Sequence, residues 1–292
     1  MQVPTWDGEL YFQYHRGVFT TQAETKGRIR RSEENVLNAE KFASLATLYE
    51  RPYPQNMEET WKNLLFDHFH DIMPGSGIAV NYLDAKRNLE DVDRAANDIT
   101  QGSLKEIAAH IDTQRNRIPI ILFNSLSWPR TGVTELEAQL PGPASQIEVV
   151  DSSGKPAEFQ LLSMDPETHR ARFLLLASTP SLGYQTYLVR ATAKAMPVHS
   201  MLKASADTLE NEFVRVKIDL QSGCMTSLFD KRSGTESVAP AETDTGGPKS
   251  TTCGNLPQTF VDEPQQWDAW NIDADFEKLH WDLDKADEVK LV

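Results

Sequence analysis

The densest group of side chains that could bind a metal or move a proton is Asp67-His68-Phe69-His70-Asp71. Imidazoles and carboxylates are ligands for zinc, and an imidazole titrates near neutral pH. The group ends an apolar pattern of helical period, in which each residue advances about 100° around the axis. His68 therefore falls within the apolar stripe, whereas His70 falls on the opposite face. We expect the side chains of His70 and Asp71 to point into the space beyond the helix end, and that of His68 to face the core.

The residue types alone leave the chemistry of this group open. Zinc takes three or four ligands, and one histidine with one aspartate does not complete a site. A solvated helix end without any metal is one interpretation, and a metallohydrolase site that uses His68, His70 and Asp71 together is another. The HxHxDH zinc motif of some hydrolases is excluded, because Ile72 and Met73 supply neither its aspartate nor its second histidine.

The elements that would position this group are helices. Residues 32–112 have helical periodicity and predict a small bundle of three helices. Ser32 is the expected N-cap of the first helix, which runs to about Tyr49. Asn56 is the expected N-cap of the second. The apolar face of this second helix is predicted to consist of Trp61, Leu64, Leu65, His68 and Ile72.

A third, longer helix is predicted after Pro74-Gly75-Ser76-Gly77, which stops the second one. It continues to about Ile111, with a break near Gly102. Its core residues are expected to alternate in steps of four and three: Ala85, Leu89, Val92, Ala96 and Ile99.

Strands are expected on both sides of the helices. A short aromatic strand is predicted over residues 10–14, and from Ile118 onward short apolar runs are separated by turn signals. These runs predict an antiparallel β-sandwich. They cover residues 118–124, 133–140, 147–150, 159–162, 172–177, 185–190 and 212–220. Residues 234–256 are rich in Ser, Thr, Gly and Pro and predict a loop or linker.

Composition and charge exclude several classes of protein. With 29 Lys and Arg against 43 Asp and Glu, the net charge of −14 argues against a nucleic-acid binder, which needs clustered cations. The sequence has no apolar run of the length that a membrane span needs, so no membrane partner is expected. The first residues lack the features of a secretory signal. Cys224 and Cys253 are expected to be reduced thiols of a cytoplasmic protein.

The segment around the histidines also carries a family resemblance. Residues 69–78 resemble the His-Asp-x-x-x-Gly-[Ser/Thr] segment of glycoside hydrolase family 38, the class II, zinc-dependent α-mannosidases of bacterial and cytosolic type. Further similar segments follow in the family's order: 8–23, 25–33, 121–130, 211–231 and 267–273. Each match is weak alone, but their collinearity over nearly the whole chain indicates homology.

The resemblance implies roles for particular residues. In that family the histidine before the aspartate is a zinc ligand, and the aspartate contacts the mannose, which places these roles on His70 and Asp71. His15 and Arg16 match a segment near the sugar-binding face, and either a substrate or a scaffold role is expected of them. The implied cofactor is Zn²⁺, and the implied partner is a mannose-containing oligosaccharide. The resemblance leaves a homo-oligomeric full-length protein open.

The resemblance also implies a multidomain α+β fold. Residues 1–31 would be the C-terminal remnant of an α/β catalytic barrel, 32–115 a three-helix bundle, and 116–292 a β-sandwich that is incomplete at its C-terminus. The family's other zinc ligands, its nucleophile and its general acid have no match here. The chain is therefore expected to be a fragment of a retaining α-mannosidase, inactive alone. The alternative is a non-catalytic carbohydrate-binding or structural module, in which Trp128, Trp267 and Trp270 could stack on sugars.

Overall fold

The computed structural model describes residues 5, 7, 15–113, 117–193, 202–238, 253–263, 265–267, 269–273 and 275–291. The chain divides into two compact units, each of which is described by itself. One unit is Gly17–Val198, and the other combines Met1–Arg16 with His199–Val292. The strand expected over residues 10–14 lies outside the described residues.

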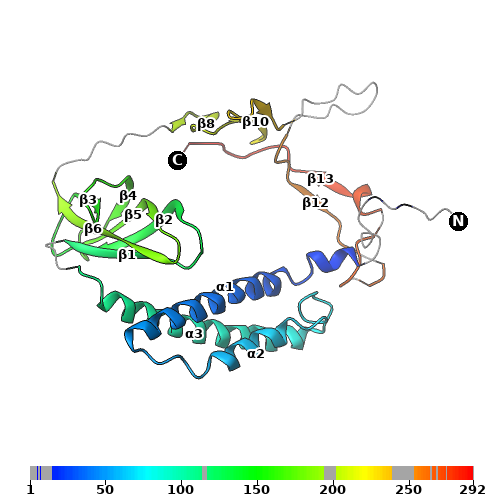
Figure 1. The fold of residues 1–292 in the computed structure, drawn as a ribbon. Helices are drawn as coiled ribbons and strands as arrows, with labels where there is room; N and C mark the ends of the chain where they lie inside the picture. The colour runs from blue at the N-terminus through cyan, green and yellow to red at the C-terminus, as the bar shows by residue number, and fades with distance from the viewer. Residues whose placement is uncertain are drawn as a thin grey trace. The chain divides into compact units, whose positions relative to one another are not determined.

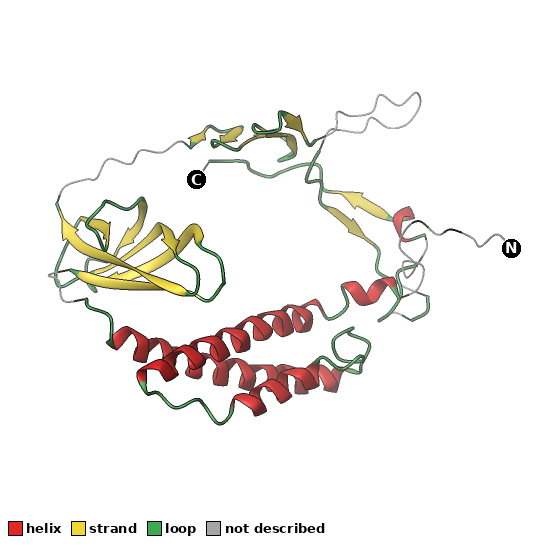
Figure 2. Ribbon diagram, viewed as in Figure 1, coloured by secondary structure: helices red, strands yellow, loops and turns green. Residues whose placement is uncertain are grey.

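Residues 15–113, all of them described, form three α-helices, as the periodicity predicts: α1 (Ala23–Ala46), α2 (Met57–Asp67) and α3 (Ala79–Ala109) (Figures 1 and 2). Short 3₁₀ turns η1 (Arg16–Phe19) and η2 (Thr47–Tyr49) flank α1. The helices share a core that includes Ile29, Val36 and Leu64. Of the five positions predicted for the third helix, this core contains Leu89, Val92, Ala96 and Ile99, and the fifth, Ala85, is buried outside it. Among these described helices, none combines the length and the apolarity needed to cross a bilayer.

The start of α1 and the break in α3 were predicted wrongly. Ser32 is not an N-cap but a buried residue inside α1, where its Oγ donates a hydrogen bond to Asp93 Oδ1 of α3 at 2.8 Å. The apolar face of α1 begins upstream at Thr25 and Ile29, so the helix starts before the acidic pair that suggested a cap. Helix α3 runs unbroken through Gly102, where a Cβ would clash with the guanidinium of Arg51.

The buried face of α2 also differs from the prediction at two positions. Leu65 is 55% exposed, whereas Leu64 is fully buried. Asp67 is buried instead, on the same face as Met57, Thr60 and Leu64. The helix ends at Asp67, so the 100° progression that placed later residues on this face stops there.

Residues 117–193 form two antiparallel sheets of three strands each. One has the order β1 (Ile118–Asn124), β6 (Gly183–Thr192), β3 (Gln146–Asp151). The other has the order β2 (Arg130–Gln139), β5 (Arg170–Thr179), β4 (Phe159–Met164). Side chains of both sheets meet in one core that contains Val149, Phe173 and Val189. Each of these strands overlaps a predicted apolar run.

The helices and the first sheet are in contact within this unit. The ring of Phe42 on α1 meets the ring of Phe123 on β1 edge to face, with 5.9 Å between centroids. Ser125 Oγ donates a hydrogen bond to Asn38 Oδ1 at 2.6 Å. Aromatic packing and a polar contact therefore join α1 to the start of the sheet region.

The second unit contains small sheets. Within residues 202–238 an antiparallel sheet has the order β11 (Thr235–Glu236), β10 (Met225–Asp230), β9 (Val214–Ile218), β8 (Thr208–Glu210), β7 (Lys203–Ala204). Farther along, β12 (Gln258–Phe260) pairs with β13 (His280–Asp282), next to the 3₁₀ turn η3 (Phe276–Lys278). The predicted loop over 234–256 contains β11 at its start, and its residues 239–252 lie outside the described part.

The two cysteines form a disulfide, so the expectation of reduced thiols was wrong. Cys224 and Cys253 are 29 residues apart in the sequence. The backbone next to Cys253 returns to β10, where Gly254 N–H donates to the carbonyl of Met225 at 2.8 Å. Sequence spacing cannot reveal this return, because it depends on the strand that Cys224 precedes.

The contrast between Leu64 and Leu65 gives a direct test of the bundle. We expect Leu64→Ala to lower the free energy of unfolding by about 2–5 kcal/mol, because it removes a fully buried side chain and leaves a cavity. Leu65→Ala is the matched control and should change it by about 0.5 kcal/mol or less. Urea unfolding followed by circular dichroism measures both. Equal losses in the two variants would contradict the placement of α2.

Candidate functional site

The turn that follows α2 carries His70 and Asp71. It is closed by backbone hydrogen bonds from the N–H groups of Ile72 and Met73 to the carbonyl of Phe69, at 2.9 and 3.0 Å. The Ile72 side chain is buried, while the side chains of His70 and Asp71 are 78% and 56% exposed. The turn therefore fixes its backbone against the bundle and presents two polar side chains to solvent.

The structure brings His70 and Asp71 together. His70 Nε2 lies 3.5 Å from Asp71 Oδ2, and the His70 ring rests against Phe69 with 4.1 Å between ring centroids. An imidazole nitrogen and a carboxylate oxygen so placed can both face one ligand. The pair can accept hydrogen bonds from hydroxyl groups or donate lone pairs to a metal ion.

His68 contacts a different element. It is the C-cap residue of α2, and its Nε2 lies 3.2 Å from Glu33 Oε1 on α1. The contact lacks hydrogen-bond alignment, so it is one of charge when the imidazole is protonated. The half-buried His68 side chain thus faces another helix of the bundle.

Asp67 is a buried acidic residue that the sequence analysis did not single out as functional. It is 1% exposed, and its Oδ2 accepts a hydrogen bond from Asn88 Nδ2 of α3 at 2.8 Å. Its Oδ1 has no partner. Burial raises the pKa of the Asp67 carboxyl, and the Asn88 hydrogen bond and the His68 charge oppose that rise. The available signal was its spacing of three residues from Leu64, which places both on one helix face.

His15 and Arg16 belong to the other unit and are described within it. The His15 N–H donates to Asn271 Oδ1 at 3.2 Å, and the His15 ring meets Trp270 edge-on at 6.0 Å. Arg16 Nη2 donates to the carbonyls of Ile272 and Asp273 at 2.8 and 3.3 Å. These contacts join residues 15 and 16 to residues 271–273.

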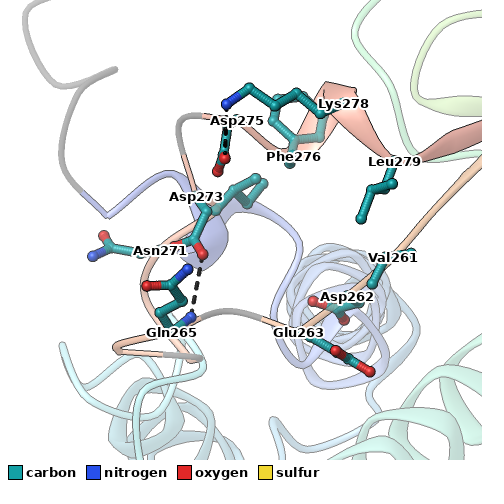
Figure 3. A pocket seen from close by; sticks show the side chains of 11 residues that line it. Val261, Asp262, Glu263, Gln265, Asn271, Asp273, Asp275, Phe276, Lys278 and Leu279 are labelled. Atoms are coloured by element: carbon teal, nitrogen blue, oxygen red, sulfur yellow. Dashed lines mark hydrogen bonds and ion pairs between the residues drawn. The ribbon is translucent and has the colours of Figure 1, made fainter.

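A cavity of about 390 Å³ lies within this second unit, in the same region (Figure 3). Figure 3 shows Lys278 joined to Asp275, with 3.1 Å between Nζ and Oδ2, and the backbone of Gln265 joined to Asp273 Oδ2 at 3.2 Å. The hydrogen bond from Lys278 lowers the pKa of the Asp275 carboxyl. The lining residues are Val261, Asp262, Glu263, Gln265, Asn271, Ile272, Asp273, Asp275, Phe276, Lys278 and Leu279. Four carboxylates make this cavity predominantly acidic.

The donor types at His70 and Asp71 suit zinc, but their number does not complete a site. Among the residues that the structure describes, no three or more His, Cys, Asp or Glu side chains gather as a metal-binding group. His68 is engaged with Glu33 and does not join the pair. Any zinc held at His70 would need ligands from outside this described set.

The buried carboxyl of Asp67 predicts a pH-dependent stability. Because its pKa is raised on folding, the folded chain binds this proton more tightly than the unfolded chain, and ionisation above about pH 4 costs stability. We expect the stability of Asp67→Asn relative to wild type to increase between pH 4 and pH 7. Urea unfolding across this range measures it, and Asp98→Asn, which replaces an exposed carboxyl of α3, is the control. A relative stability that falls with pH would contradict the placement of Asp67.

Two family models match the chain. Residues 13–107 match the alpha mannosidase middle domain, and residues 209–292 match the glycosyl hydrolases family 38 C-terminal domain. The first match contains the turn with His70 and Asp71. The second contains the acidic cavity.

Similar proteins are α-mannosidases. Alpha-mannosidase 2C1 of Mus musculus is 28% identical over 93% of this chain and 23% of its own length. An alpha-mannosidase of Saccharomyces cerevisiae is 24% identical over 93% of this chain and 20% of its own length. This chain therefore spans about a quarter of the curated relatives that it matches.

Solved structures show a similar fold. A crystal structure of an alpha-mannosidase from Enterococcus faecalis V583 matches with a TM-score of 0.59 at 19% identity, over 76% of this chain and 30% of that one. A glycosyl hydrolase family 38 protein from Enterococcus faecalis matches with a TM-score of 0.62 at 19% identity, over 81% and 32%. With both family models matched in order, this chain belongs to glycoside hydrolase family 38.

Proposed function

We propose that this chain carries part of the mannose site of a zinc-dependent, retaining α-mannosidase, with His70 as a zinc ligand and Asp71 as a contact of the sugar. The observation that carries the proposal is the exposed pair itself. His70 Nε2 and Asp71 Oδ2 lie 3.5 Å apart on a turn inside the matched mannosidase middle domain. The substrate would be an oligosaccharide with terminal α-linked mannose.

The chemistry of Asp71 follows from its exposure and charge. An ionised carboxylate can accept two hydroxyl hydrogen bonds from adjacent positions of a sugar ring, and such charge-assisted bonds are stronger than neutral ones. His70 would hold one position of the metal. The ion, when bound, would polarise sugar hydroxyl groups.

The catalytic carboxylates are proposed to lie outside this chain. Retaining hydrolysis needs a nucleophile and a general acid about 5–5.5 Å apart across the scissile bond. The exposed His70–Asp71 pair contains one carboxylate, whereas this reaction needs two. Phe66, Phe69 and Ile78 near this turn are large exposed hydrophobic residues, which supports coverage of this end by further polypeptide. The isolated chain would then be inactive.

The proposed domain organisation follows from the same membership. Residues 1–31 would be the end of a catalytic α/β barrel, 32–115 the helical bundle, and 116–292 a β-sandwich domain completed by further strands. The shared core of the sheets from residues 117–193 supports the sandwich. Helix α1 begins at Ala23, so the boundary between barrel and bundle is proposed to lie before this residue rather than at residue 32.

The cysteines and the net charge bear on the compartment and the partners of the protein. Cytoplasmic localisation was expected from reduced thiols, and the disulfide removes that support, because disulfides are typical of oxidising compartments. The net charge of −14 supports a partner other than nucleic acid. A homo-oligomer of the full-length protein stays a prediction.

One observation favours the alternative of a non-catalytic carbohydrate-binding module. Trp267 is 60% exposed and stacks on Trp270 with 5.9 Å between ring centroids. Trp267 also has a left-handed backbone, with φ 59°, held by hydrogen bonds from the N–H groups of Trp270 and Asn271 to its carbonyl. An exposed indole fixed in this way can stack on the apolar face of a sugar ring.

A titration with methyl α-mannoside in the presence of zinc separates the two functions. We expect amide NMR shifts confined to residues 69–77 of the 292-residue chain and lost in Asp71→Ala, with no turnover of p-nitrophenyl α-mannoside. The control is Asp84→Ala, which removes an exposed carboxylate from α3 and should leave the shifts unchanged. Shifts centred on Trp267 and lost in Trp267→Ala would favour the binding module. Strong zinc-dependent turnover by the chain alone would contradict the proposal that its catalytic carboxylates lie elsewhere.

A further inference from the structure

The turn that carries His70 and Asp71 is held by a lysine of another helix. Lys26 lies in the first turns of α1, and its ammonium has three N–H donors. They donate to the carbonyls of Thr21, Met73 and Pro74 at 2.7, 3.0 and 2.8 Å. Each donor thus has a backbone acceptor, and two of the three acceptors belong to the turn.

Tyr82 of α3 holds the other side of the same turn. Its buried hydroxyl accepts a hydrogen bond from the Gly77 N–H at 2.6 Å and donates one to the carbonyl of Asp71 at 3.3 Å. The hydroxyl therefore bridges Asp71 and Gly77. The two bonds attach the backbone of this segment to α3 at both of its ends.

The backbone of the turn also approaches the start of α1 closely. Gly75 has φ +92°, and a Cβ at this position would lie 2.6 Å from the carbonyl oxygen of Thr21. Thr21 is the same residue whose carbonyl accepts from Lys26. Lys26 thus joins the two segments of backbone at the point where they meet.

We propose that Lys26 and Tyr82 are positioning residues for His70 and Asp71, an inference that rests on the proposed function for its purpose but not for its geometry. Both act on backbone atoms of residues 71–77 rather than on a ligand. They fix the direction in which the two exposed side chains leave the turn. The site is therefore built from three helices, although its exposed pair comes from a single turn.

Hydrogen exchange of the 292-residue chain, without metal or sugar, tests this role. Lys26→Met keeps most of the length of the side chain and removes its donors. We expect the amides of Ile72, Met73 and Gly75 to exchange about tenfold faster in this variant, while Val92 in the core of α3 is unchanged. Tyr82→Phe should accelerate exchange of Gly77 by a similar factor. Lys62→Met removes an exposed lysine paired with Glu58 and is the matched control.

A second readout reports the direction of His70 itself. The His70 and Phe69 rings are 4.1 Å apart, so a nuclear Overhauser effect between them is expected in wild type and should weaken in Lys26→Met and Tyr82→Phe but not in Lys62→Met. Unchanged exchange and an unchanged Overhauser effect in both variants would overturn the proposal. The two proposals can fail separately. If the variants lose protection but the wild-type chain binds no mannoside, the proposed function is overturned and the positioning role stands.

Discussion

The ammonium of Lys26 joins the beginning of α1 to the turn after α2, and the geometry of the candidate site depends on this contact. A lysine side chain that gives all its donors to carbonyls replaces the water that those carbonyls would otherwise bind. Helix α2 ends at Asp67, so the carbonyls of Met73 and Pro74 lie beyond it and accept hydrogen bonds from Lys26 instead of from helical N–H groups. The cation therefore provides hydrogen-bond donors to backbone carbonyls that lie outside the helices.

Polar groups next to the turn also hold the end of α2. Asp67 is buried with one oxygen bonded to Asn88 and the other without a partner, which is an unfavourable arrangement for a carboxylate. His68 contacts Glu33 of α1 next to it. These contacts connect the last residues of α2 to both neighbouring helices. Together with Lys26 and Tyr82, these contacts attach the backbone that carries His70 and Asp71 to both α1 and α3.

The sequence was sufficient to predict the elements with strong periodicity. The core positions of α3 and each strand between residues 117 and 193 were located from spacing alone, since burial imposes that spacing. The helix ends were harder. Ser32 has the residue type of a cap but serves as a buried donor to Asp93, a role that depends on a neighbouring helix. Leu64 and Leu65 are equally apolar, and only the packing of α2 decides which is buried.

The candidate site shows the same limit. His70 and Asp71 were found because their types suit a metal and because the surrounding segment resembles a family motif. Lys26 and Tyr82 were not, because they bind backbone carbonyls and an amide, which every residue carries. The disulfide was missed because pairing depends on how β10 and residues 253–255 meet.

We propose that zinc binds to His70 and not to His68. Zinc titration of the 292-residue chain by calorimetry tests it most directly, with His70→Ala and His68→Ala measured alongside wild type. Because His70 and Asp71 supply only two ligands, we expect weak zinc binding by wild type. This binding should be abolished in His70→Ala and retained in His68→Ala. Tight stoichiometric binding that is lost equally in both variants would contradict it and would point to a metal site built from both histidines.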